Sequence, residues 1–76
     1  MRFHVTTHFA SRLAERGISI EDAKETVLHP DNVEYQRSGT HGGKVRLFRR
    51  LQSRVLAVVA ETKNDEAWLA TAYYED

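Results

Sequence analysis

A chain of 76 residues has room for one folded domain with one hydrophobic core. Apolar residues make up 41% and charged residues 29%, which excludes a disordered or fibrous chain. There is no cysteine, so disulfides and thiolate chemistry are excluded, and a domain this small without such cross-links makes a homodimer or a tight partner a reasonable expectation. No segment has the length and apolarity of a membrane span or of a signal peptide, so we expect a cytoplasmic protein without membrane contact.

The net charge is zero, with eleven basic and eleven acidic residues, but the charges are unevenly distributed. Residues 37–54 contain six basic residues and no acidic residue. A local positive field attracts anionic ligands even when the whole chain is neutral. The alternative is that this basic segment is only the solvated face of a pair of strands.

Two amphipathic helices are predicted in the first third of the chain. Thr6 or the threonine after it is a suitable N-cap for a helix that ends near Arg16, and Gly17 is a suitable residue to follow that helix. Residues 19–22 (Ser-Ile-Glu-Asp) resemble a capping box and begin a second helix, which Pro30 ends. The short link between the two predicts a compact helical hairpin or corner.

After the second helix the apolar residues repeat with a period of two, which predicts strands over residues 33–37, 44–51, 54–61 and 67–74. The third strand is apolar on both faces, so we expect it in the centre of the sheet. Short connections after the second and third strands predict antiparallel hairpins. The predicted fold is therefore α+β, with two N-terminal helices packed on a four-stranded antiparallel sheet in the order α-α-β-β-β-β. The expected core contains Phe9, Leu13, Ile20, Val27, Val58 and either Leu56 or Val59.

His8, Arg12 and Arg16 follow one another at intervals of four residues and form one stripe along the first predicted helix. Guanidinium groups hold phosphate through paired hydrogen bonds, and an imidazole transfers protons near neutral pH. The stripe therefore predicts a phosphate-binding site. The alternative is a solvated polar face on which Glu15 pairs with an arginine.

The basic segment contains Phe48, and tyrosines lie on the neighbouring predicted strands. Arginines beside aromatic rings on a sheet face are typical of proteins that bind single-stranded RNA. Phe48 and Trp68 are expected inside, because a domain this small needs such rings in its core. Tyr73 and Tyr74 must point to opposite faces of their strand, so one of them is expected to face solvent.

The four histidines do not indicate a metal site. His4 and His8 are four residues apart, but His4 precedes the predicted N-cap and no third ligand has a suitable spacing. His29 and His41 are expected to be exposed side chains without a role in binding. We therefore expect neither a metal nor any other cofactor.

Two parts of the sequence resemble a known family: residues 7–23 (THFASRLAERGISIEDA), and residues 56–59 together with 70–73 (LAVV and ATAY). They are similar to small bacterial domains of unknown function that open with His-Ala-x-x-Arg-x-x-x-Arg-Gly-Ile. Those domains resemble BrnT-like toxins in the wider RelE-like group of toxin–antitoxin ribonucleases. The resemblance covers residues 7–74, and Phe9 stands where the family usually has a small residue.

The resemblance implies a RelE-like fold and a metal-independent ribonuclease, with RNA as substrate and a cognate antitoxin protein as partner. Cleavage of RNA by its own 2′-hydroxyl needs a base, a group that protonates the leaving oxygen, and cations on the phosphate. Carried onto this chain, the resemblance assigns catalytic roles to His8, Arg12, Thr71 and Tyr73. The basic residues expected to contact RNA are Arg16, Lys44, Arg46, Arg49 and Arg50, of which Arg46 and Arg49 point to opposite faces of their strand.

The leading interpretation is thus a RelE-like, toxin-type protein that acts on RNA. The alternative is a small non-catalytic module that binds nucleic acid or another protein. Such a module could also be a homodimer. The adjacent reading frame distinguishes the two interpretations, because a short acidic or DNA-binding antitoxin there favours the first.

Overall fold

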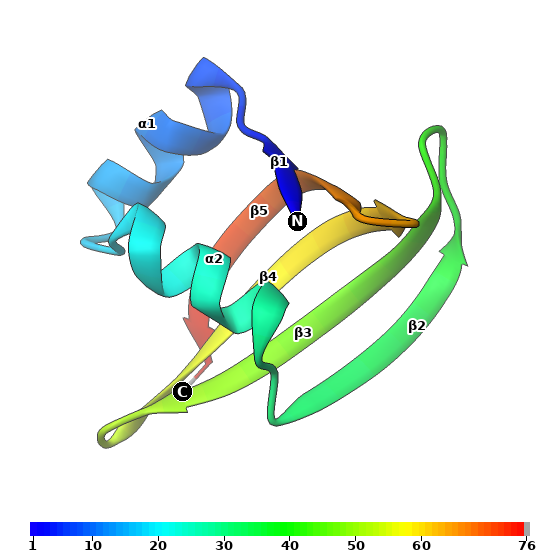
Figure 1. The fold of residues 1–76 in the computed structure, drawn as a ribbon. Helices are drawn as coiled ribbons and strands as arrows, with labels where there is room; N and C mark the ends of the chain where they lie inside the picture. The colour runs from blue at the N-terminus through cyan, green and yellow to red at the C-terminus, as the bar shows by residue number, and fades with distance from the viewer. Residues whose placement is uncertain (76) are drawn as a thin grey trace.

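The computed structural model of the chain describes residues 1–75. Its elements are, in chain order, β1 (Arg2–His4), α1 (Thr7–Glu15), α2 (Ile20–Leu28), β2 (Asn32–Ser38), β3 (Gly43–Leu51), β4 (Arg54–Lys63) and β5 (Glu66–Glu75). The five strands form one sheet in the order β1-β5-β4-β3-β2, and both helices lie on one face of it (Figure 1). The predicted α+β class is confirmed.

The sheet differs from the prediction because it has a fifth strand. β1 runs parallel to β5, with Arg2 opposite Glu66 and His4 opposite Trp68, whereas the other three strand pairs are antiparallel. The predicted four-stranded antiparallel sheet was therefore wrong, since the sheet is mixed and its first strand precedes both helices. A strand of three residues is too short to show an alternating pattern, and its position depends on a pairing with the far end of the chain.

Both helices begin where the sequence predicted. The Thr6 hydroxyl accepts a hydrogen bond from the Phe9 backbone N–H at 3.0 Å, and the Ser19 hydroxyl accepts one from the Asp22 backbone N–H at 3.0 Å. Gly17 follows α1 with a φ of +65°, a conformation that glycine adopts without the strain a side chain would cause. These local signals place the two helices against the sheet.

The core lies between the helices and the face of the sheet that they cover. Its fully buried members include Phe9 on α1 and Leu56 and Val58 on β4, the central strand predicted from its double apolar pattern. Ile20 is only partly buried and packs against this core, while Val59 is buried on the opposite face of the sheet. The core cluster consists of Phe9, Leu13, Ile18, Ala23, Val27, Leu47, Leu56, Val58, Ala60, Ala67, Leu69 and Ala72.

Within residues 1–75 no helix lies on the other face of the sheet, and we call it the open face. A bulge in β5 opposite Val59 and Ala60 leaves Ala70 without a partner in the register, so that Trp68 and Thr71 lie on the same face. Phe48 is buried as predicted, although on this face and not in the helix-covered core. The prediction for Trp68 was wrong, because its ring is only partly buried and lies on the open face. The open face is formed mainly by His4, Lys44, Arg46, Phe48, Arg50, Val55, Ala57, Val59, Glu61, Trp68, Thr71 and Tyr73.

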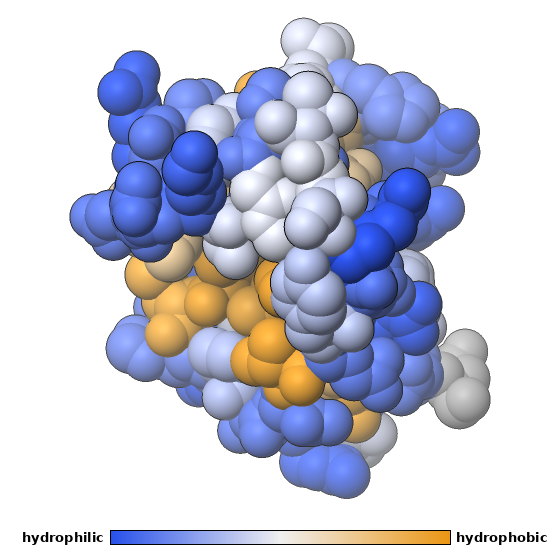
Figure 2. Space-filling view, turned by 90° about the vertical axis from the view of Figure 1, so that its right-hand side faces the viewer, coloured by the Kyte–Doolittle hydropathy of each residue, from blue (hydrophilic) through white to orange (hydrophobic). Residues whose placement is uncertain are grey.

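β2 forms one edge of the sheet, and all seven of its residues are exposed. Val33 is 49% exposed and Tyr35 is 65% exposed, and Leu28 at the end of α2 is also exposed. Figure 2 faces this side of the molecule and shows an apolar area surrounded by polar residues. The helices therefore cover the middle of the sheet and leave β2 exposed to solvent.

Candidate phosphate-binding site

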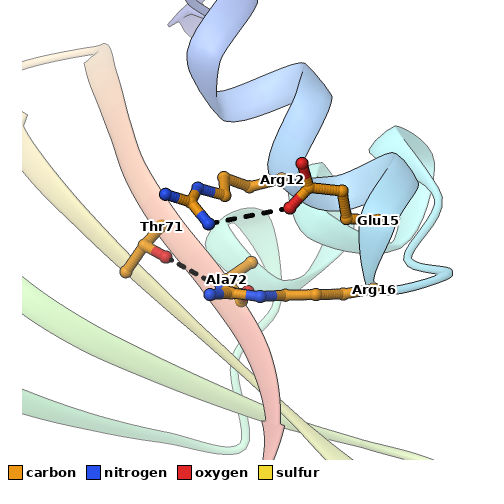
Figure 3. A network of polar contacts seen from close by, with 5 residues as sticks. All are labelled: Arg12, Glu15, Arg16, Thr71 and Ala72. Atoms are coloured by element: carbon orange, nitrogen blue, oxygen red, sulfur yellow. Dashed lines mark hydrogen bonds and ion pairs between the residues drawn. The ribbon is translucent and has the colours of Figure 1, made fainter.

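Two arginines of the predicted stripe meet the edge of β5. The Arg16 Nη1 atom donates hydrogen bonds to the Ala72 carbonyl oxygen at 2.7 Å and to the Thr71 Oγ1 atom at 3.2 Å. Arg12 extends from α1 toward the same part of β5, as Figure 3 shows. The structure therefore brings Arg12, Arg16 and Thr71 together at one place, which we call the α1–β5 corner.

The corner exists because β1 covers only the first part of β5. β1 pairs with residues 66–68, so no other strand of the described part of the chain lies beside the outer backbone groups of the residues that follow. An unpaired carbonyl at a sheet edge needs another hydrogen-bond donor or water. Arg16 supplies that donor to Ala72, which fixes its guanidinium group at the edge of β5.

Arg12 is held less firmly than Arg16. Its Nη1 atom lies 3.6 Å from the Glu15 Oε1 atom, and the two side chains are 46% and 65% exposed. This is the pairing expected if the stripe were only a solvated polar face. Exposed ion pairs contribute little to stability, so the pair leaves Arg12 available to a stronger anionic ligand.

The other two predicted catalytic residues lie next to the corner. His8 is exposed on α1, one helical turn before Arg12, and within residues 1–75 its ring makes no hydrogen bond or ion pair. Tyr73 lies on the open face, two residues after Thr71, and is partly buried. Tyr74 points to the opposite face and packs against the core, as the alternation predicted.

The basic residues of β3 do not form one group. Arg46 is on the open face, two strands from Thr71 in the same cross-strand row, whereas Arg49 lies on the helix side and donates to the His29 carbonyl oxygen. Lys44 and Arg50 share the open face with Arg46.

Acidic residues neutralise much of the positive charge of β3. A pocket of about 350 Å³ is lined by Arg46, Arg49 and Arg50 but also by Asp31, Glu34 and Glu75. Glu34 approaches Arg46 at 3.9 Å, and the Asp31 carboxylate accepts a hydrogen bond from the Arg50 backbone N–H. The pocket has as many carboxylates as arginines, whereas the α1–β5 corner has two arginines and one carboxylate, Glu15. The corner is consequently the better anion site of the two.

Sequence reasoning missed an aromatic stack on the open face. The rings of His4 and His41 each lie 4.7 Å from the Trp68 ring, with interplanar angles of 4° and 9°. His41 and His29 are both exposed as expected, but the stack of His41 on Trp68 was not predicted. No sequence signal joins these rings, because they come from a strand at each end of the chain and a loop in its middle.

Two further classes of site are not found among the described residues. Within residues 1–75, no three histidine or acidic side chains are placed so that they could hold a metal ion. The same residues contain no helix with the length and apolarity needed to cross a membrane.

The comparison with protein families matches residues 5–74 to the domain of unknown function DUF4258. The chain belongs to the DUF4258 family. The match contains both helices, β2, β3, β4 and all of β5 except its last residue, together with the whole α1–β5 corner. The comparisons of this DUF4258 protein with curated proteins and with solved structures give no match.

The two arginines of the corner are expected to differ in their effect on stability. Arg16→Ala removes two hydrogen bonds to β5, so we expect the free energy of unfolding to fall by about 1 kcal/mol. Arg12→Ala loses only an exposed ion pair and should change it by less than about 0.5 kcal/mol. Urea unfolding followed by circular dichroism measures both values. Equal losses from the two variants would contradict a structural role for Arg16.

Proposed function

We propose that this DUF4258 protein binds RNA at the α1–β5 corner and cleaves it without a metal ion. The observation that carries the proposal is the convergence of Arg12 and Arg16 on Thr71 at a solvent-exposed strand edge. A guanidinium group has five N–H donors, and Arg16 uses only Nη1 for its bonds to β5. Its remaining donors and those of Arg12 are suited to hold one phosphate between them.

The neighbours of the corner suit the proton transfers that RNA cleavage requires. In the proposed reaction the 2′-oxygen attacks the phosphorus, the bond to the 5′-oxygen breaks, and a cyclic phosphate forms. His8 takes the proton from the 2′-hydroxyl, and the Tyr73 hydroxyl gives a proton to the leaving oxygen. Thr71 positions the phosphate, because its hydroxyl accepts a hydrogen bond from Arg16 and keeps its own proton to donate.

A toxin of a toxin–antitoxin pair is the cellular role that we propose for this activity. The support is the resemblance of residues 7–74 to RelE-like toxins, together with the exposed position of the corner. In that role the chain slows growth when it is expressed alone, and an antitoxin protein binds it and relieves the effect. A binding module without catalysis would use the same corner but would leave RNA intact.

Binding of RNA is expected to depend on salt and on Arg12. Each lost phosphate contact lowers the slope of log affinity against log salt by about 0.7 for a single strand. Arg12→Ala should show this decrease, whereas Arg37→Ala, on β2 at the opposite edge of the sheet, should not. Fluorescence anisotropy with a labelled oligouridine at several salt concentrations measures the slopes. Identical slopes for the two variants would place the phosphate contacts away from the corner.

Cleavage of RNA is expected to depend on His8. General acid–base catalysis contributes about a hundred- to ten-thousand-fold to a rate, so His8→Ala should remove most cleavage without unfolding the exposed first turn of α1. Tyr73→Phe deletes one hydroxyl and should cause a smaller loss. The assays are cleavage of total RNA, with and without ribosomes, and cell growth on expression, with circular dichroism as the folding control. A wild-type chain that is inert in every assay would overturn the enzymatic part of the proposal and leave the binding part.

A further inference from the structure

Trp68 is the only tryptophan of the chain, and the fold places it outside the core. A ring this large usually contributes most of its area to the core of a small domain. Here it lies on the open face, between the ring of His4 from β1 and the ring of His41 from the loop that joins β2 and β3. The two imidazoles therefore cover opposite faces of the indole.

The two histidines are held differently. His4 belongs to a paired strand, and its Nε2 atom lies 2.8 Å from the Glu66 carboxylate. The His41 side chain is exposed, and within residues 1–75 its ring is held only by the stack on Trp68. The face of Trp68 under His41 is therefore the one that another planar group can reach when the His41 loop moves.

The loop that carries His41 is built around one carboxylate. The Glu61 Oε1 atom accepts a hydrogen bond from the His41 backbone N–H at 2.6 Å, and a side chain at Gly39 would collide with the Glu61 carboxylate. Glu61 lies directly opposite Trp68 in the register of β4 and β5, on the open face. When the loop moves away, an acceptor-only carboxylate is left beside the exposed indole face.

A stacking surface beside such a carboxylate favours one nucleobase. Guanine has two adjacent N–H donors on its Watson–Crick edge, which match the two oxygens of a carboxylate. Adenine and cytosine place an acceptor nitrogen beside their amino group, and uracil has a single N–H between two carbonyls. Base–aromatic stacking is tolerant of sequence, so Glu61 would supply the preference and Trp68 the affinity.

We propose that Trp68 and Glu61 form a binding site for a guanine base of single-stranded RNA, in which the guanine takes the place of the His41 ring. The inference rests on the proposed RNA binding for its natural ligand. Trp68 and Thr71 lie on the same face of β5 and pair with Glu61 and Val59, which are two residues apart on β4. They are therefore about 7 Å apart along the strand, so one RNA strand can contact both the guanine site and the α1–β5 corner. The site thus supplies the base preference that the phosphate contacts of the corner lack.

The experiment titrates the protein with the pentanucleotides UUGUU and UUUUU and follows Trp68 fluorescence. UUGUU should quench Trp68 and bind about tenfold more tightly than UUUUU. His41→Ala should raise the affinity for UUGUU several-fold because the competing ring is gone, whereas the matched control His29→Ala should not change it. Glu61→Gln should reduce the preference for UUGUU, since an amide replaces one acceptor oxygen with a donor.

Three results would overturn the guanine site: UUGUU binds without quenching Trp68, His41→Ala weakens binding, or Glu61→Gln keeps the full preference. Arg12→Ala should weaken the binding of both oligonucleotides equally. This variant tests the α1–β5 corner independently of the guanine site. If neither pentanucleotide binds, guanosine and uridine monophosphates are titrated instead. Quenching by the guanine nucleotide alone would then support the site and overturn the proposed RNA function, and no quenching would overturn both.

Discussion

Two helices of nine residues each can cover only one face of a five-stranded sheet. This limit leaves the open face and the edges of the sheet as the surfaces that a ligand can reach. α1 and α2 bury the helix side of β3, β4 and β5, and the open face must remain in contact with solvent. The open face nevertheless buries Phe48 and Val59. A small domain thereby gains a second apolar layer while it keeps arginine, tyrosine and tryptophan side chains accessible.

The two edges of the sheet differ in their contacts, and this difference is why we place the RNA site at β5. At the β5 edge, Arg16 donates a hydrogen bond to the carbonyl oxygen of Ala72. This bond fixes its positively charged guanidinium group beside Thr71. At the other edge β2 is exposed along its whole length. The two arginines can therefore have different roles. Arg16 holds α1 to the edge of β5, and Arg12 remains available to bind a phosphate.

Much of this fold could be predicted from local signals. The Thr6 and Ser19 caps, Gly17 and the change of period after Pro30 all depend on residues close together in the chain, and each agrees with the structure. β1 could not be predicted, because three residues carry no pattern and their position comes from pairing with β5.

The candidate site could be predicted only in part, for the same reason. Helical spacing aligned His8, Arg12 and Arg16, but nothing local showed that Arg16 reaches a carbonyl of β5. The stack of His4 and His41 on Trp68 joins three distant segments, so the sequence suggested a core tryptophan where the structure has a partly buried one on the open face. The alternation of β3 separated Arg46 from Arg49 without showing which of them shares a face with Thr71.

The most direct measurement of the central claim is a ¹H–¹⁵N NMR titration of the labelled protein with a short single-stranded RNA. The side-chain Nε–H signals of Arg12 and Arg16 and the backbone amides of residues 8–16 and 71–73 report on the α1–β5 corner. If RNA binds at the corner, these signals shift together and saturate at one RNA concentration, while the amide signals of β2 do not shift. Shifts confined to β2 and the pocket beside Arg46 and Arg50 would contradict binding at the corner.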